Sequence, residues 1–317
     1  MNVSEIFGQI PSEFILTGLS WVSEQKLTAW CSLLFLLMYI VVILGNCGII
    51  ILVRADRKLH EPMHVLTSLL AMLDLTVASS VIPKVLAILW YDSNTVSAGA
   101  CLTQMYILYT MFGFESSLFA LMSLDRYVAI CHPLRHNTVM SNSFIIKLIL
   151  FTVVRNSTLL VPMPILTKAL TFCKNNLIAH SYCEFVEVIK LSCGDLTPLV
   201  IYMVSLIFLI PASDNAIIIF SYIMILKVVH SLKSSEAQWK ALNTCSSHAI
   251  MLSMFYFSAC IPLVIFLYFP DSPLPLKTLP EVLSCLLIPV INPIVYGVRT
   301  KEIQEGFKRL YWKVLAF

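Results

Sequence analysis

Asp74, Glu115 and Arg155 are ionisable residues deep within long apolar stretches of this chain, where charge is unusual. Asp74 comes 12 residues after Pro62, where its stretch begins, and Glu115 comes 11 residues before the charged end of its own stretch. If both stretches are helices rising about 1.5 Å per residue, both carboxylates lie about 16–18 Å from those ends and could share a depth. Arg155 has a similar place in a third stretch. Buried charge is costly unless it is compensated, so we expect the carboxylates to bind a cation, to take up a proton or to pair with an arginine.

A charged pair, Asp125–Arg126, stands at the end of the apolar stretch that begins near Cys101. A membrane helix would meet water at this point. Because charge is costly inside a bilayer, a carboxylate–guanidinium pair at such a helix end usually has a function. The alternative is an ordinary solvated helix end.

The sequence offers no arrangement for covalent or hydrolytic catalysis. It contains no His-Glu-x-x-His, no Gly-x-Ser-x-Gly and no paired aspartates in transmembrane motifs, so no nucleophile is provided with a base. We therefore expect the protein not to be an enzyme. We also expect no cofactor, apart from an ion that the buried carboxylates could bind.

The composition is that of a membrane protein. Of the 317 residues, 58% are hydrophobic and 12% are charged, whereas roughly 25% of the residues of a soluble domain are charged. Apolar runs long enough to cross a hydrocarbon core of about 30 Å fall at 29–53, 62–90, 98–131, 143–166, 197–227, 240–268 and 277–297. We therefore predict an all-α membrane protein, a bundle of seven transmembrane helices. The net charge of +3 gives no reason to expect nucleic acid as a partner.

The basic residues that flank these spans predict the orientation. Those on one side are Arg54, Arg57, Lys58, Arg126, Arg135, Lys147, Lys227, Lys233, Lys240, Arg299, Lys301, Lys308, Arg309 and Lys313. Those on the other side are Lys26, Lys168, Lys174, Lys190 and Lys277. Since cytoplasmic loops carry the excess of basic residues, we place the N-terminus outside and the C-terminus in the cytoplasm, in a multi-pass membrane protein.

The chain divides into an extracellular N-terminus (1–28), a transmembrane domain (29–297) and a cytoplasmic tail (298–317). Acidic residues and the lack of a basic start argue against a cleaved signal peptide, so we expect the first span to direct insertion. Asn2 begins a glycosylation sequon on the outer side. The similar sequon at Asn156 lies inside a span, and we expect that it is not glycosylated.

The tail contains a pattern typical of a short amphipathic helix. Ile303, Phe307, Leu310 and Tyr311 would share one helical face, with charged residues opposite. Such a helix lies on the inner membrane surface, with membrane lipid as its partner. A frayed polar tail is the alternative.

The ten cysteines fall into two groups. Four would face the oxidising exterior, where disulfides form, and they permit three pairings, among which spacing alone does not choose. These are Cys101, Cys173, Cys183 and Cys193. The rest lie in spans or at their inner ends and would behave as small apolar residues: Cys31, Cys47, Cys131, Cys245, Cys260 and Cys285.

Motifs over nearly the whole chain resemble one family. The run from Met122 to His136 ends the third span, and Lys240-Ala-Leu-Asn-Thr-Cys-Ser-Ser-His248 begins the sixth. Further matches are Gly45-Asn46, Leu59-His-Glu-Pro-Met-His64, Ser221-Tyr222 and Asn292-Pro-Ile-Val-Tyr296. Together they resemble vertebrate olfactory receptors, which are seven-helix, rhodopsin-like G-protein-coupled receptors. Glu115-Ser-Ser and Val295-Tyr-Gly-Val-Arg-Thr-Lys301 resemble the fish-like class, class I.

The resemblance implies an odorant receptor that activates a heterotrimeric G protein of the stimulatory, olfactory type and raises cAMP. It implies the disulfides Cys101–Cys183 and Cys173–Cys193, which would fold the second outer loop over the bundle. It also assigns coupling and activation to the inner ends of the helices, at Asp125, Arg126, Tyr127, Tyr222, Lys240, His248, Asn292, Pro293 and Tyr296. For the last tyrosine and for Tyr222, anchoring at the membrane interface is the alternative role.

For the buried carboxylates, the resemblance points to a sodium site at Asp74 and Glu115. Asn46 and Asn292 are candidate polar neighbours, and oxygen ligands suit such a hard cation. An ion pair between Arg155 and Glu115 and protonated carboxyl groups are the two alternatives.

The family's ligand pocket lies in the outer halves of the third, fifth, sixth and seventh spans. Transferred onto this chain, it is lined by Met105, Leu108, Tyr109, Phe112, Met203, Leu206, Ile207, Ile210, Tyr256, Cys260, Leu263 and Cys285. This lining is apolar with two phenols, which suits a small volatile molecule. The outer end of the sixth span has no cation to pair with an acid, so we predict a neutral ligand.

Two other functions compete with this prediction. One is a seven-helix receptor for a small molecule that is not an odorant, in a tissue other than the nose. The other is a transporter or a channel, which would need a polar path, whereas the outer half of these spans is mostly apolar.

Overall fold

The computed structural model describes residues 10–22, 24–173, 175–269 and 271–315. Within these ranges the side chains of residues 244, 263, 266, 267, 311 and 313–315 are not described. The glycosylation sequon at Asn2 therefore lies outside the described residues.

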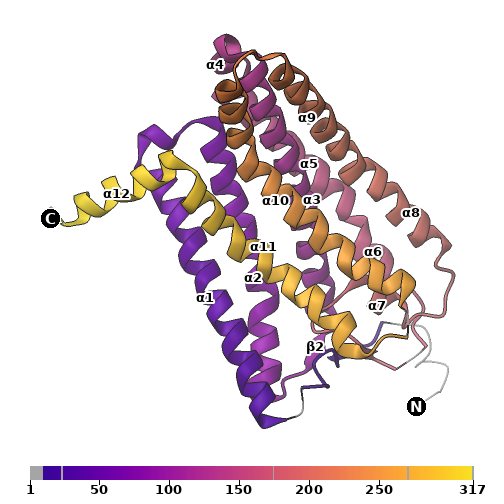
Figure 1. Cartoon of the computed structure of the whole chain (residues 1–317). Helices are drawn as coiled ribbons and strands as arrows, with labels where there is room; N and C mark the ends of the chain where they lie inside the picture. The colour runs from indigo at the N-terminus through magenta and orange to yellow at the C-terminus, as the bar shows by residue number, and fades with distance from the viewer. Residues whose placement is uncertain (1–9, 23, 174, 270, 316–317) are drawn as a thin grey trace.

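The described residues form a bundle of long helices (Figure 1). The spans are α1 (Gln25–Ala55), α2 (Pro62–Tyr91), α3 (Ala98–Cys131), α5 (Asn142–Leu160) continued by α6 (Pro162–Lys168), α8 (Thr197–Ile207) continued through the π-helix η4 (Phe208–Ala212) into α9 (Ser213–Ser231), α10 (Ser235–Tyr268) and α11 (Leu274–Arg299). By length and composition six of these runs could cross a membrane as they stand, and α10, bent by 44° between Ser235–Asn243 and Cys245–Pro262, makes a seventh. The predicted seven-helix bundle is confirmed.

The helices extend beyond the predicted apolar runs at most ends. The reason is that backbone hydrogen bonding continues into polar residues until a cap ends it. The side chain of Ser234, for example, accepts a hydrogen bond from the Ala237 amide, so α10 begins five residues before the predicted 240.

Shorter elements connect the spans. They are η2 (Arg57–Leu59), η3 (Pro133–Arg135), α4 (His136–Val139), α7 (Phe185–Ile189) and α12 (Lys301–Leu315), with the strands β1 (Glu13–Leu16), β2 (Thr95–Ser97) and β3 (Leu177–Ile178). Strand β1 pairs antiparallel with β2 and parallel with β3. The chain before α1 is therefore joined to two outer loops by the backbone hydrogen bonds of this sheet. Gly18 allows this, because a Cβ there would lie 2.3 Å from the carbonyl carbon of His180.

Helix α3 lies at the centre of the bundle and contacts α2, α5, α6, α9 and α10. In its most apolar segment 67% of the residues are buried, against 22–50% in the other single spans. A central helix can couple events at the two faces of the membrane, since a shift in its position changes its contacts with most of the other helices. Gly45 brings another pair close, because a Cβ there would lie 2.8 Å from Pro293 of α11.

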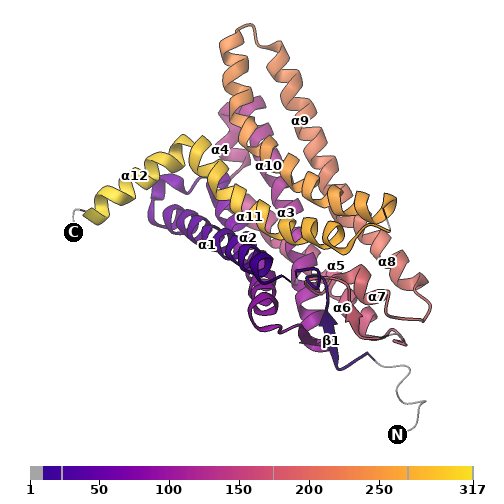
Figure 2. The ribbon, with the colours of Figure 1, turned by 60° about the horizontal axis from the view of Figure 1, so that its bottom comes forward.

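The amphipathic helix predicted after the last span is present as α12, which leaves the bundle at an angle to α11 (Figure 2). Ile303 is fully buried in the inner core, the apolar cluster that also contains Leu52, Leu59 and Phe119. The guanidinium of Arg309 lies 2.7 Å from Asp56, which follows α1. Apolar packing and an ion pair therefore hold the start of this helix to the inner end of the bundle.

Candidate functional site

The charged pair Asp125–Arg126, close to the last residue of α3 at Cys131, lies at the inner end of the bundle. Arg126 Nη2 is 3.6 Å from Asp125 Oδ2, and the Nε2 atom of His136, in α4, is 3.0 Å from Asp125 Oδ1. Asp125 is buried, whereas Arg126 keeps partial exposure. One aspartate therefore holds both the arginine and the loop after α3. The contact with His136 was not predicted from the sequence.

An aromatic cluster joins α3, α9 and α10 just above this pair. Tyr222 Oη is 2.9 Å from Nδ1 of His248, and the two rings stack with centroids 6.0 Å apart. The ring of Phe119, in α3, lies 5.8 Å from the His248 ring. The three helices would have to break this cluster in order to separate at the inner end.

The other residues predicted for coupling lie around the cluster. Tyr296 is only 2% exposed and belongs to the inner core, so it is not an anchor at the membrane interface. Tyr127 contacts the rings of His132 and Phe220. Lys240 is exposed near the start of α10, and Pro293 is buried in α11.

The carboxylate of Asp74 lies in the middle of the bundle with an amide beside it. Asn292 Nδ2 donates to Asp74 Oδ2 at 2.7 Å, and Asn46 Nδ2 donates to the carbonyl oxygen of Pro289 at 2.9 Å. The carboxylate of Glu115 is buried within electrostatic reach of Asp74. The predicted shared depth of these two carboxylates therefore agrees with the structure.

Three side-chain oxygens of these residues receive no hydrogen bond from the described part of the protein. Glu115 Oε1, Asn46 Oδ1 and Asn292 Oδ1 are buried and accept no hydrogen bond from any described residue. Oxygen atoms of this kind fit a hard cation such as sodium. The described residues hold no group of three or more His, Cys, Asp or Glu suited to a metal ion. Amide and hydroxyl oxygens would therefore have to complete a sodium site.

Arg155 does not pair with Glu115, and that predicted alternative is wrong. The guanidinium of Arg155 donates to Oδ1 and Oδ2 of Asp214 at 2.8 and 2.9 Å. It also donates to Ser117 at 2.7 Å and to Ser213 at 3.3 Å. The geometry decides the partner, because Asp214 sits in the first turn of α9 and faces α5, where Arg155 lies.

Sequence reasoning missed Asp214. The signal was present, since an aspartate within the predicted span 197–227 is as unusual as Asp74 or Glu115 in theirs. Asn156 joins the same network, donating to Ser117 at 3.0 Å, and is fully buried. The acceptor Asn156 of this sequon is therefore enclosed in the bundle.

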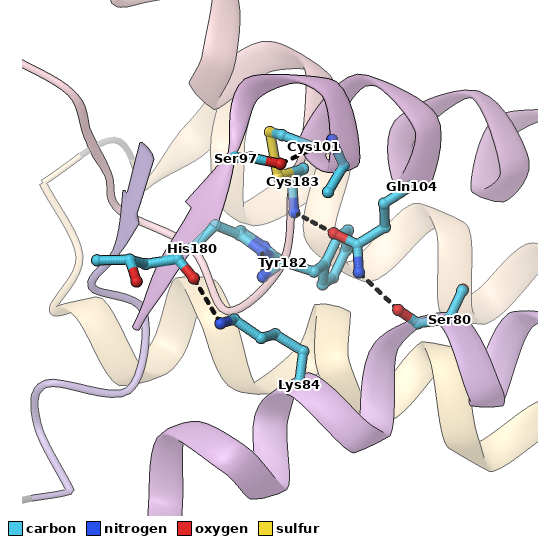
Figure 3. Close-up of a disulfide and its surroundings, with 10 residues drawn as sticks. Ser80, Lys84, Ser97, Cys101, Gln104, His180, Tyr182 and Cys183 are labelled. Atoms are coloured by element: carbon cyan, nitrogen blue, oxygen red, sulfur yellow. Dashed lines mark hydrogen bonds between the residues drawn. A yellow bond between two sulfur atoms is a disulfide. The ribbon is translucent and has the colours of Figure 1, made fainter. Parts of the chain in front are cut away.

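Both predicted disulfides are present, Cys101–Cys183 and Cys173–Cys193. The first ties the top of α3 to the second outer loop (residues 169–196). Gln104 reinforces this link, because its side chain accepts from the Cys183 amide at 3.0 Å and donates to the carbonyl oxygen of Ser80 at 2.6 Å (Figure 3). The loop thus covers the outer end of the bundle as a fixed lid.

The residues predicted to line the ligand cavity fall into neighbouring groups. Met105, Tyr109 and Met203 pack with Phe185 of the lid, and Leu206 and Ile210 pack with the same tyrosine and methionine. A second group, on the side of α11, contains Leu108, Phe112 and Cys285, together with Tyr182 of the lid. Tyr256 packs instead against the inner core.

Two further predicted lining residues, Ile207 and Cys260, do not join these groups. Ile207 is 58% exposed and faces away from the bundle, because α8 buries only a narrow stripe that includes Leu199 and Leu206. Successive helical residues are about 100° apart, so Ile207 turns outward when Leu206 turns inward. Cys260 is also exposed. The side chain of Leu263 lies outside the described residues.

The two phenols of the predicted lining already donate hydrogen bonds within the protein. Tyr109 Oη donates to Glu184 Oε1 of the lid at 3.0 Å, and Tyr256 Oη donates to Oδ1 of Asn215. His180 of the lid is 3% exposed and contacts Glu281 of α11. Glu184 and Asn215 were not predicted, because no local pattern marks them. Glu281 was also missed, although an acidic residue within the predicted span 277–297 is the same signal as Asp214.

Comparison with known proteins identifies the family. A family model described as "Olfactory receptor" matches residues 35–313. Human olfactory receptor 51E1 is 41% identical over 300 residues, covering 94% of this chain and 93% of that protein. Human olfactory receptor 52N2 is 40% identical over 297 residues, covering 93% and 92%. Olfactory receptor 56B34 of Mus musculus is 38% identical over 301 residues, covering 95% and 92%. With seven apolar helices, two outer disulfides and these relatives, the chain belongs to the olfactory receptor family and is a multi-pass receptor of the plasma membrane.

Proposed function

We propose that this receptor binds a small, neutral, hydrophobic odorant beneath the lid and activates a stimulatory G protein, which raises cAMP. The observation that carries the proposal is the position of α3. This one helix presents Tyr109 to the lid, Phe119 to the aromatic cluster and Arg126 to the cytoplasmic end. A ligand that moves the outer part of α3 would therefore act directly on the inner contacts.

The inner contacts describe a two-state switch. In the structure, Asp125 holds Arg126 while Tyr222 and His248 join α9 to α10. A ligand shifts such an equilibrium only by binding one state more tightly than the other. Opening of α10 would break the Tyr222–His248 contact and release Arg126 to meet the G protein.

We also propose that sodium occupies the space beside Asp74 and Glu115. The support is the set of buried oxygens on Glu115, Asn46 and Asn292 that accept no hydrogen bond from a described residue. A cation there would compensate two carboxylates that share a depth, and its charge would stabilise the state that encloses it.

The membership of a receptor family supports the expectation that the protein is not an enzyme. Membrane lipid is the proposed partner of α12, whose face beyond Ile303 includes the half-exposed Phe307. The competing function is that of a receptor for a small molecule that is not an odorant.

The deciding experiment is a cAMP assay on cells that express the wild type and Arg126→Ala, with surface expression measured. We expect a neutral odorant to raise cAMP in the wild type and to lose that effect in the variant at equal surface level. An odorant response that survives in Arg126→Ala would contradict the assigned coupling. Silence of a well-expressed wild type across a broad panel of odorants would favour a different ligand.

A further inference from the structure

Glu184 is an acidic group in the lid that the coupling mechanism does not use. It directly follows the disulfide residue Cys183 and caps α7, since its Oε2 accepts from the Glu187 amide at 2.8 Å. Its Oε1 accepts from Tyr109 of α3 at 3.0 Å. Both oxygens accept hydrogen bonds, which is the pattern of an ionised carboxylate. Each oxygen has a further lone pair for another donor.

A second carboxylate, Glu281, reaches the same region from α11. It contacts His180, the buried histidine of the lid. His180 and Glu281 are the side chains of described residues that act electrostatically on Glu184, one favouring its charge and the other opposing it. Glu281 therefore contacts His180 directly, and Glu184 lies within electrostatic reach of both side chains.

The nearby side-chain donors are largely committed to the protein. The hydroxyl of Tyr109 donates to Glu184 itself, and the amide of Gln104 donates to the Ser80 carbonyl. In Figure 3 the Gln104 side chain is held between Ser80 and Cys183, with Tyr182 beside it. What this region offers to a ligand is therefore mainly the capacity to accept hydrogen bonds.

The electrostatic environment makes a further donor valuable. Burial raises the pKa of Glu184, and Glu281 adds to that effect, whereas His180 and the amides of Val186 and Glu187 oppose it. A ligand group that donates to the carboxylate would favour its charged form. A ligand group that can only accept hydrogen bonds would add another acceptor beside the carboxylate oxygens of Glu184 and Glu281.

From this geometry we infer that the odorant carries a hydroxyl group, which donates a hydrogen bond to the Glu184 carboxylate while its chain packs against Met105, Met203 and Phe185. The inference rests on the proposed function and names its ligand class. A carboxylic acid is disfavoured because it would face two carboxylates. A ketone of the same shape is disfavoured because it has no proton to donate.

The test uses four straight-chain series of short to medium length: alcohols, ketones, carboxylic acids and amines. Each series is assayed for cAMP in cells expressing the wild type. We expect alcohols to be at least about tenfold more potent than ketones of equal length, since a hydrogen bond to a charged group is worth at least that ratio. In Glu184→Gln the ratio of alcohol to ketone potency should fall to about one, because the amide both donates and accepts.

Two further variants separate recognition from folding. Glu187→Gln alters the same short helix at a side chain that pairs with Lys190, and it should leave the ratio unchanged. Glu184→Asp keeps the charge on a shorter side chain and should keep the preference for alcohols at lower potency. The same preference in Glu184→Gln, at normal surface level, would overturn the inference.

The outcomes distinguish this inference from the proposed function. Activation by ketones or acids in preference to alcohols, lost in Arg126→Ala, would support the receptor function and refute the hydroxyl ligand. Amines as the most potent series would show that the site selects a cation, which refutes the neutral hydroxyl. Silence of all four series at normal surface level would count against both.

Discussion

At the scale of single residues, the buried charges differ in how they are compensated. Arg155 and Asp214 form a paired, hydrogen-bonded unit that also includes Ser117. Glu115 has one carboxylate oxygen that accepts nothing from the described residues. A paired charge depends on its partner, whereas an uncompensated carboxylate depends on a proton or a bound ion. The two kinds of site should respond differently to neutralising substitutions.

Asp214→Ala should destabilise the receptor strongly. It leaves Arg155 as a buried cation without its carboxylate, and breaking such a pair costs about 3–5 kcal/mol. The measurement is the Tm of the solubilised receptor together with its surface level. Glu115→Gln is the matched control and should keep a surface level close to that of the wild type. Normal stability of Asp214→Ala would show that the ion pair contributes little.

Sodium should stabilise the receptor through Asp74 and Glu115. At roughly ten times its Kd, a bound ion adds about 1.4 kcal/mol to the free energy of unfolding. The Tm in sodium chloride should therefore exceed the Tm in choline chloride at equal ionic strength. Asp74→Asn should abolish this difference. Equal Tm values for the wild type in the two salts would remove the case for a sodium site.

At the scale of elements, the lid is held by covalent, backbone and side-chain links at once. The disulfide Cys101–Cys183 fixes it to α3, and β3 pairs with β1. Strand β1 pairs in turn with β2, where the carbonyl oxygen of Thr95 accepts from Lys84 of α2 at 2.6 Å. This hydrogen bond also gives a partner to the amino group of Lys84, which lies within the predicted span 62–90. The lid can therefore hold acidic side chains such as Glu184 over the bundle in one fixed geometry.

Glu184→Gln should change the pH dependence of stability. The folded-state pKa of Glu184 is raised above its ordinary value of 4.5, chiefly by burial. Ionisation therefore destabilises the folded state as pH rises from 4.5 through the raised pKa. The variant lacks this effect, so its Tm relative to the wild type should increase over that window and be smallest in acid. A difference in Tm that is constant with pH would contradict the raised pKa.

At the scale of the whole molecule, the bundle joins a rigid outer end to an inner end held by few polar contacts. The outer end has two disulfides and a three-stranded sheet. The inner end relies on the Asp125 contacts, the Tyr222–His248 pair and apolar packing. Motion should therefore concentrate at the inner end, where we propose that the G protein binds.

Tyr222→Phe should raise basal cAMP. It removes the hydrogen bond to His248 but keeps the ring, so it weakens the closed inner end with little change in packing. A loss of about 0.5–1.5 kcal/mol from the closed state shifts the equilibrium about two- to twelvefold. The readout is basal cAMP at matched surface level. A fall in both basal and odorant-evoked cAMP would instead show that Tyr222 supports the open state.

The sequence by itself determined the spans, their orientation, the amphipathic tail and the family. These features follow from the length and periodicity of apolar runs and from motifs, all of which are local along the chain. The pairing of the cysteines came from the family resemblance, since their spacing left three choices. The placement of Asp74 and Glu115 at a shared depth also followed from counting along helices.

Only the tertiary structure decided which side chains meet. Arg155 pairs with Asp214, Tyr109 donates to Glu184, and Asp125 contacts His136. The side chain of Ile207 points away from the bundle. The depth of a residue follows from its number along a helix. Its partner depends on how each helix is rotated and on how the loops fold back, and packing between distant segments sets both.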